Sequence, residues 1–498
     1  MDRRHQILAQ MSYAAAARYI SQGLRIVRGI GLAHFLGPAG FGLWNAMRIV
    51  LQFCGYAELG ARSGMLQHAT YAEATRQTDH ANRLRGTAAT VNLVGAIAVA
   101  AGIAFVISIP GLAIGDRWLW VALAGLVVTQ NMWMYLQSSL RSQRRYGLCS
   151  SLSILMATLS TGLGVLGAYW YGIAGFLAAL ILCYLLAYTT SFWFAGQFPR
   201  LVVDRDQASR LIRTGFPIMV GDLLKVLMWN VDKILVWILM GKHALGIYAL
   251  QSTITNAIML LPAGISEVLY PHVVAGIGRS KSIDTSRRYL TDGADLLSRA
   301  MCPILAVAFL VLPLPIRWLL PAYHETVAPG QVLVLATFFP IAGTVAGSVL
   351  VALGGQRVLL AASAAGVIVA GIGVGLAIQS GGGYVAIALG AAAGLLTRAG
   401  ISTAAAMTRA GLETPARIGF LARLASRFAL LVLVVAGAAW AVPAAPDSLL
   451  LDCLLTTLRC TLALAVFAPG MLKAWRTQRR NGWLAAARPV GDETTSHA

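Results

Sequence analysis

The chain has 498 residues, of which 58% are hydrophobic and only 12% are charged, and its formal net charge is +20. A soluble protein carries about a quarter charged residues, whereas residues 146–199 of this chain contain no Asp, Glu, Lys or Arg. Because a membrane-spanning helix needs about 20 apolar residues, this composition excludes a soluble enzyme and a protein with a single membrane anchor. It predicts an all-α integral membrane protein with many spans.

The hydropathy of the sequence predicts about 14 transmembrane helices. Several connections between them are tight, such as 169–172 and 380–383, so the helices on either side are expected to run antiparallel. In chain order, the predicted spans are 11–33, 41–66, 87–109, 118–140, 148–170, 172–195, 216–240, 244–270, 296–315, 331–353, 358–379, 383–408, 424–443 and 447–470.

Cations are unevenly distributed over the loops that these spans define. The loops on the side of both termini carry almost all of the loop Lys and Arg residues, whereas the opposite loops carry only Arg117, Lys242 and Arg317. Because loops rich in Lys and Arg stay in the cytoplasm, the pattern predicts a multi-pass protein with both termini cytoplasmic.

A short internal repeat occurs where a second half of the chain would begin. Residues 35–46 read FLGPAGFGLWNA and residues 239–250 read LMGKHALGIYAL. The matching positions are Gly37 with Gly241, Gly42 with Gly246, and Trp44 with Tyr248. Each segment ends one predicted helix and begins the next, and duplicated helical bundles with a substrate path between them are common in transporters.

The repeat and the span count together predict three regions. We expect an N-terminal helical bundle of six spans at 1–210 and a C-terminal bundle of six spans at 211–410. Residues 411–498 would then form two additional spans and a basic cytoplasmic tail.

The first predicted span carries three arginines at membrane depth. Arg18 and Arg25 are two helical turns apart on one face, and Arg28 follows about 60° round the helix. Three arginines facing lipid would cost on the order of 8–10 kcal/mol. We therefore expect them, with Arg48 of the second span, to face water, a carboxylate or an anionic ligand. Arg18 is close enough to the cytoplasmic end to reach the membrane surface instead.

Two pairs of charges in the spans have the spacing of internal ion pairs. Arg62 follows Glu58 by four residues, and Lys225 follows Asp222 by three. Side chains at these spacings are neighbours on a helix, so a structural role competes with a functional one at both pairs.

Four further charges lie at membrane depth. Asp232 and Lys233 are adjacent and are expected to point apart, so that one could meet the opposite half of the protein. Arg398 and Arg459 lie centrally in their helices, where each could either line a cavity or form a hydrogen bond to a neighbouring helix.

The cations in the spans outnumber the acids, and this excess favours an anionic ligand. Arginine pairs the oxygens of a phosphate in a bidentate manner, and a diphosphate offers several such oxygens. The predicted substrate-binding residues are Arg18, Arg25, Arg28, Arg48, Lys233 and Arg398. The predicted ion-coupling residues are Glu58, Asp222 and Asp232. No catalytic residue, metal site or cofactor is predicted, because the chain has neither a phosphate-binding glycine loop nor a His-Glu-x-x-His pair.

Two parts of the sequence resemble the bacterial oligosaccharide (O-antigen and exopolysaccharide) flippases, the polysaccharide-transporter branch of the MOP exporter superfamily. The first is AHFLGPAGFGLW at 33–44, followed by Glu58-Leu59-Gly60. The second runs over 211–275 and includes Gly215-Phe216-Pro217 and Asn230-Val231-Asp232-Lys233.

This resemblance implies two pseudo-symmetric helical bundles around a central cavity, as in MATE-like proteins. It also implies that Arg18, Arg25, Arg28 and Arg48 bind the diphosphate of a polyprenyl-linked oligosaccharide. The expected function is to move this repeat unit across the bacterial inner membrane for surface polysaccharide biosynthesis, by alternating access coupled to an ion gradient. Expected partners are the lipid-linked oligosaccharide, membrane lipid and polysaccharide polymerase or export machinery, but not nucleic acid.

Two other functions stay open at the level of sequence. A cation-coupled multidrug antiporter of the same superfamily would depend on Glu58 and Asp232 rather than on the arginines. A membrane glycan polymerase or ligase would need an acid and a base near the outer surface, and the only candidates there are His324 and Glu325.

Overall fold

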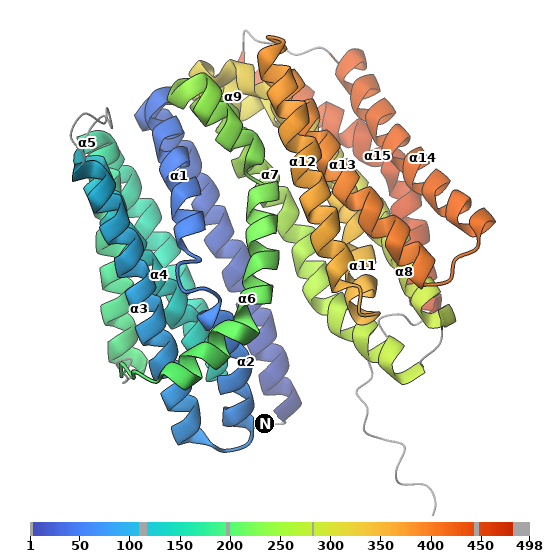
Figure 1. Cartoon of the computed structure of the whole chain (residues 1–498). Coiled ribbons are helices and arrows are strands. Elements are labelled where there is room, and N and C mark those ends of the chain that lie inside the picture. The colour runs from blue at the N-terminus through green and yellow to red at the C-terminus, as the bar shows by residue number, and fades with distance from the viewer. Residues whose placement is uncertain (1–2, 109–116, 196–199, 281–282, 443–447, 482–498) are drawn as a thin grey trace, which may run out of the picture. The chain divides into compact units, whose positions relative to one another are not determined.

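The computed structural model describes residues 3–108, 117–195, 200–280, 283–442 and 448–481, and the regular secondary structure of this part of the chain is helical, without strands. The predicted basic tail beyond residue 481 lies outside the described residues. Figure 1 shows the helices in chain order. They are α1 (Arg3–Cys54), α2 (Ala61–Ala74), α3 (Thr78–Ser108), α4 (Arg117–Ser142), α5 (Tyr146–Ala195), α6 (Arg205–Met228), α7 (Val231–Ser280), α8 (Ile283–Val311), α9 (Pro313–Leu319), the 3₁₀ helix η1 (Pro321–Thr326), α10 (Val327–Ala336), α11 (Phe338–Ala352), α12 (Gln356–Gln379), α13 (Gly383–Arg409), α14 (Thr414–Ala441) and α15 (Leu449–Asn481).

Eleven helical segments of the described part are long and apolar enough to cross a membrane. The multi-pass helical prediction is confirmed. The number is smaller than the 14 spans predicted, because Tyr13–Cys54, Tyr146–Ser191 and Val231–Thr255 each contain residues of two predicted spans, joined across a kink. The kinks lie at Gly37 in α1, at Tyr171 and Gly172 in α5, and at Gly241 in α7, where the backbone leaves the helical conformation.

Contacts on either side of the kinks in α5 and α7 show that the chain folds back at both. In α5, a Cβ atom on Gly175 would lie 2.1 Å from the carbonyl oxygen of Gly167, although eight residues of straight helix span about 12 Å. In α7, the Tyr248 hydroxyl donates to Asp232 over 3.0 Å, a pair that a straight helix would hold about 24 Å apart. Each of these helices is therefore a hairpin of two antiparallel segments.

The two copies of the internal repeat pack against each other through their backbones. Gly37 and Gly241 have nearly identical conformations, with φ of 64° and 84° and ψ of 177° and −177°. A Cβ atom on Gly42 would lie 1.7 Å from the carbonyl oxygen of Lys242, and one on Gly246 would lie 1.8 Å from that of Pro38. Because Pro38 and Lys242 also match in the repeat, the contact is reciprocal, and it confirms the repeat as a structural one.

The described chain divides into two compact units. Unit 1 comprises 1–257, 319–326 and 370–387, and unit 2 comprises 258–318, 327–369 and 388–498. Unit 1 thus includes η1, which is hydrogen-bonded to α1 and α7 through Tyr323 and Thr326. The division of the sequence at residues 210 and 410 stays a prediction.

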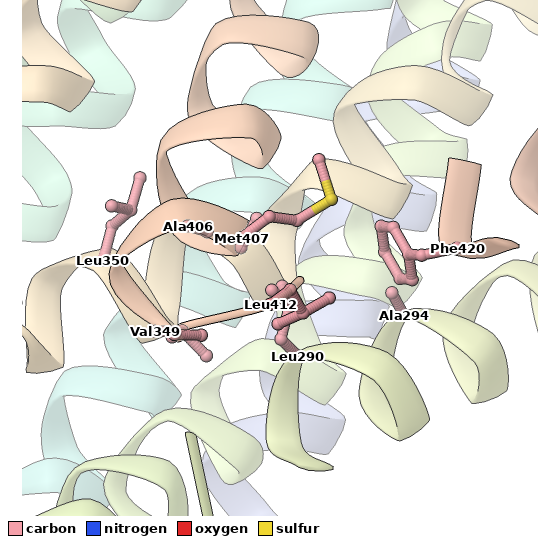
Figure 2. Close-up of a cluster of buried hydrophobic side chains, with 10 residues drawn as sticks. Leu290, Ala294, Val349, Leu350, Ala406, Met407, Leu412 and Phe420 are labelled. Carbon is pink, nitrogen blue, oxygen red and sulfur yellow. The ribbon is translucent and has the colours of Figure 1, made fainter. Parts of the chain in front are cut away.

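Each unit has its own apolar core. In unit 1, Met65 of α2, Leu84 of α3, Tyr135 of α4 and Leu211 of α6 belong to one buried cluster. Figure 2 shows a cluster in unit 2, which joins α8, α11, α13 and α14. Its labelled members are Leu290, Ala294, Val349, Leu350, Ala406, Met407, Leu412 and Phe420. Small residues at such interfaces let membrane helices approach closely.

Candidate functional site

The first segment of α1 and the first segment of α5 lie side by side in unit 1. The hydroxyls of Tyr13 and Ser151 are 2.8 Å apart. Farther along, the Thr161 hydroxyl donates to the Leu24 carbonyl over 3.0 Å. A third contact follows, since a Cβ atom on Gly31 would lie 3.0 Å from the Val165 side chain. The two segments therefore run parallel in a fixed register, and this register sets the surroundings of the arginines on α1.

Arg28 lies at this helix pair, partly buried. Its Nη1 donates to the hydroxyl of Ser160 over 2.8 Å, and its Cδ lies beside Gly164 of the same segment of α5. Tyr184, on the second segment of α5, is within electrostatic range of the guanidinium. Among the described side chains, no carboxylate pairs with Arg28.

Arg48 approaches Arg28 from the second segment of α1. The two guanidinium groups are within electrostatic range of each other, although a straight helix would hold them about 30 Å apart. The Nε atom of Arg48 is buried and has no hydrogen-bond partner in the described part of the chain. A buried donor without a partner costs about 1–3 kcal/mol, and a like charge nearby adds to this cost, so the position favours an anion.

Arg25 and Arg18 extend the same face of α1. Both are exposed, and the two lie within electrostatic range of each other. Arg25 also lies within electrostatic range of Tyr184. Arg18, Arg25, Arg28 and Arg48 are hereafter called the arginine cluster. In this cluster, which belongs to unit 1, each arginine is within electrostatic range of the next one along the chain.

The predicted ion pair at the end of the second span is present. Glu58 is 1% exposed and lies in the turn between α1 and α2, where one oxygen accepts from the backbone N–H of Arg62 over 2.8 Å. The other oxygen lies 3.4 Å from Nη2 of Arg62. Leu59 and Gly60 of this turn both have positive φ, 53° and 89°, and this conformation points the carboxylate back at the start of α2.

The expectation that Asp232 and Lys233 point apart is wrong. Lys233 Nζ lies 3.2 Å from Asp232 Oδ1 and also donates to the Trp229 carbonyl over 2.5 Å. The hydroxyl of Tyr248 donates to the other oxygen of Asp232. The side chain of lysine is long enough to bend back along its own helix, and burial of both residues, each 5% exposed, favours the pair over two separated charges.

The remaining predicted residues lie elsewhere. Asp222 and Lys225 form an exposed ion pair of 2.9 Å on α6. Arg398 belongs to α13 in unit 2, where its Nε donates to the Ser363 hydroxyl over 3.1 Å. Arg459 of α15 donates to the carbonyl of Val442 over 2.6 Å.

Three relevant residues were missed at the level of sequence. Ser160 and Tyr184 lie in the long uncharged stretch, where a single hydroxyl gives no signal of its own. Asp452 at the start of α15 is 2% exposed and accepts from Arg317 Nη1 and Trp318 Nε1 over 2.8 and 3.1 Å. An acid inside an apolar run was the available signal for it.

The fold is that of transporters with solved structures. An inward-facing multidrug resistance MATE family transporter of the MOP superfamily aligns with a TM-score of 0.64 and 15% identity, over 78% of this chain and 94% of its own. A MOP superfamily transporter from Pyrococcus furiosus, described as having a binding pocket of reverse polarity, aligns with a TM-score of 0.58 and 12% identity, over 80% and 95%. A MATE transporter from Vibrio cholerae aligns with a TM-score of 0.55 and 16% identity, over 82% and 95%.

Similarity in sequence is found with a family and not with individual curated proteins. No curated protein is significantly similar to this chain. Residues 31–329 match the family described as polysaccharide biosynthesis protein. This match covers more than half of the sequence and includes both copies of the internal repeat. The chain therefore belongs to the polysaccharide biosynthesis protein family, and its fold is that of the MOP superfamily transporters.

Proposed function

We propose that the protein is a flippase that moves a polyprenyl-diphosphate-linked oligosaccharide repeat unit across the bacterial inner membrane. The observation that carries this proposal is the arginine cluster, in which Arg28 and Arg48 are partly buried and have no carboxylate partner among the described residues. A diphosphate supplies the negative charge that this arrangement lacks. Family membership supports a substrate that belongs to polysaccharide synthesis.

The residues have distinct roles in this proposal. Arg28 and Arg48 hold the diphosphate by charge-assisted hydrogen bonds, which are shorter and stronger than neutral ones. Ser160 orients the guanidinium of Arg28, and Ser160 and Tyr184 offer additional hydroxyls to phosphate oxygens. Arg25 and Arg18, being exposed, attract the anion along α1. Both termini lie in the cytoplasm, so the substrate enters from the side where lipid-linked sugars are assembled.

An ion gradient drives the cycle. Glu58, Asp222 and Asp232 are the candidate coupling residues, because acids in or near membrane spans commonly carry protons or cations in transporters. Asp232 already has the ammonium of Lys233 and the hydroxyl of Tyr248 on its two oxygens. Both contacts stabilise the charged carboxylate, so coupling at Asp232 requires the pair with Lys233 to open during the cycle.

Transport by purified protein in liposomes tests the proposal. The substrate is a fluorescent lipid-linked oligosaccharide, and its accessibility in the outer leaflet is followed with a sugar-binding reagent. Arg28→Gln and Arg48→Gln are each expected to lower the flipping rate about tenfold or more, since a hydrogen bond to a charged group contributes about 1.5–3 kcal/mol. Arg117→Gln, a change of an exposed arginine at the start of α4, is the matched control.

The two outcomes that contradict the proposal are different. Unchanged flipping by both variants would remove the arginine cluster from the substrate path. Transport of an organic cation such as ethidium, dependent on Asp232 and insensitive to Arg28→Gln, would identify a multidrug antiporter instead.

A further inference from the structure

Unit 1 contains an open pocket of about 650 Å³ where α2 meets the turn between α4 and α5. Helix α2 contributes one face of about two and a half turns, and the turn contributes cations and an aromatic ring. The lining residues are Leu66, Gln67, Thr70, Tyr71, Ala74, Arg141, Arg144 and Tyr146. This set, hereafter called the turn pocket, does not include any member of the arginine cluster.

The arginines and tyrosines of the turn pocket are available to a ligand. Arg141 and Arg144 are exposed, and within the described part of the chain neither side chain forms a hydrogen bond or an ion pair. The rings of Tyr71 and Tyr146 are 73% and 44% exposed. Two guanidinium groups suit a phosphate-bearing headgroup, and two exposed phenols with an apolar body and a polar tip suit an adjoining sugar.

The backbone at Arg144 allows a substitution that removes the side chain without straining the fold. Arg144 has a φ of 57°, and the N–H of Arg145 bonds to the Leu140 carbonyl over 3.0 Å, the pattern in which a helix ends on a left-handed residue. Glycine is preferred there because it has no Cβ to strain.

Other helices of this chain follow the preference for glycine. Gly354, Gly381 and Gly411 occupy the same position at the ends of α11, α12 and α13, with φ between 66° and 71°. Arg76, after α2, is the second arginine in this position, with a φ of 61°, but it does not line the turn pocket. Arg144 therefore has a charged side chain at a position where the backbone conformation favours glycine.

The turn pocket lies at one end of the helix pair that carries the arginine cluster. Tyr146 is the first residue of α5, and the same segment of α5 contacts Tyr13 through Ser151 and Arg28 through Ser160. At 1.5 Å per residue, Tyr146 is about 21 Å from Ser160 along the helix. A ligand leaving the turn pocket along this pair would meet Arg18, Arg25 and Arg28 in succession.

We propose that the turn pocket is the entry site for the diphosphate-sugar headgroup of the lipid-linked substrate, which binds Arg141 and Arg144 before it moves to the arginine cluster. This proposal rests on the proposed function, since it names the substrate of that same transport path. The anionic headgroup of an ordinary phospholipid shares the phosphate chemistry, and the test below separates the two.

Binding to the full-length protein in nanodiscs of neutral phosphatidylcholine tests the pocket without transport. The probe is polyprenyl diphosphate without sugars, measured by native mass spectrometry over a range of probe concentrations. The arginine cluster and the turn pocket should each bind one probe molecule, and native mass spectrometry resolves the two. Arg144→Gly should weaken binding of one of these two molecules about tenfold, because it removes charge-assisted hydrogen bonds. Arg76→Gly is the matched control, because it makes the same backbone change outside the pocket and should leave binding unchanged. Both variants should melt at the same temperature as the wild type or higher, so loss of folding does not explain a difference.

Three results would overturn the proposal. The first is binding of the probe with wild-type affinity by all three variants, Arg144→Gly, Arg76→Gly and Arg141→Gln. The second is weakening of both glycine variants to the same extent, which would mean a general charge effect. The third is an equal loss of phosphatidylglycerol binding in a parallel series, which would identify a phospholipid site. A wild-type protein that binds the probe in this manner but does not flip the full substrate would contradict the proposed function alone.

Discussion

Gly42 and Gly246 each contact the backbone of the opposite copy of the internal repeat. A Cβ atom on Gly42 would come within 1.7 Å of the Lys242 carbonyl oxygen, and one on Gly246 within 1.8 Å of the Pro38 carbonyl oxygen. The two contacts involve main-chain atoms, which cannot rotate away as a flexible side chain can. The segment of α1 that follows its kink and the hairpin of α7 are therefore held together by an interface that tolerates only glycine at positions 42 and 246.

Substitution of either glycine tests this interface. Gly42→Ala and Gly246→Ala should each lower the free energy of unfolding by about 1–3 kcal/mol or more, the usual cost of overpacking. The measurement is thermal unfolding in detergent. Gly162→Ala on α5 is the control, because a Cβ atom there would meet nothing within 4 Å, and it should be neutral or stabilising by up to about 1 kcal/mol. Equal effects at all three positions would contradict the backbone contact.

Arg48 should show opposite effects on stability and on transport. Arg48→Met removes a buried Nε that has no hydrogen-bond partner in the described residues, so the free energy of unfolding should rise by about 1–3 kcal/mol. The flipping rate should fall, because the same change removes a ligand of the diphosphate. Thermal unfolding and liposome transport measure the two effects on one preparation.

Arg85 provides the contrast for this experiment. Its guanidinium bonds to Glu73, Ser142 and Asn82, so Arg85→Met should destabilise the protein rather than stabilise it. A destabilised Arg48→Met variant with normal transport would reverse the assignment and make Arg48 a structural residue.

The Asp232–Lys233 pair should behave as one unit in a double-mutant cycle. Asp232→Asn leaves the ammonium of Lys233 buried without its carboxylate, which costs about 3–5 kcal/mol. Asp232→Asn combined with Lys233→Met should recover most of this loss, since no buried charge then remains. Unfolding of the four proteins in denaturant gives the coupling energy. Additive effects of the two changes would show that the charges do not interact.

Transport by the double variant separates pairing from ion coupling. If Asp232 carries the coupling proton, the stable Asp232→Asn/Lys233→Met protein should flip substrate down its gradient but should not respond to an imposed proton gradient. A response equal to that of the wild type would leave Glu58 and Asp222 as the coupling candidates.

The hydroxyl of Tyr323 should stabilise the packing of η1 against α1 within unit 1. It donates to the Ala33 carbonyl over 3.0 Å, and the side chain is 1% exposed. Tyr323→Phe keeps the ring and its edge contact with Phe41 but leaves a buried carbonyl with one hydrogen bond fewer. We expect a loss of about 1 kcal/mol in thermal unfolding. Tyr323→Phe should leave stability unchanged if the hydroxyl contributes nothing beyond the ring.

Most helices and the three kinks could be predicted from the sequence because apolar runs and glycines determine them locally. The predicted spans 41–66 and 216–240 were wrong as continuous helices, because the structure interrupts them between α1 and α2 and between α6 and α7. The predicted breaks near Gly37, Gly172 and Gly241 coincide with the observed kinks. The pairing of Glu58 with Arg62 was likewise predicted from their spacing, although Glu58 lies in the turn before α2 and not on the helix that the spacing rule assumes.

The partners of the arginines could not be predicted, because they come from distant parts of the chain. The Ser160 hydroxyl reaches Arg28 only through the register of α1 against α5. The arrangement of Asp232 and Lys233 was predicted wrongly because adjacent residues diverge in a regular helix. This rule gives the direction in which each side chain leaves the backbone. It does not prevent the ammonium group of a long lysine side chain from bending back to a neighbouring residue.

The carboxylate of Asp452 has a consequence for the last two helices. It binds Arg317 and Trp318, so α15 neutralises a charge that belongs to the stretch between α8 and η1. A chain shortened after α14 would leave that guanidinium without its counter-charge. The C-terminal pair of helices is for this reason an integral component of unit 2, and a shortened protein should be judged first by whether it accumulates in the membrane.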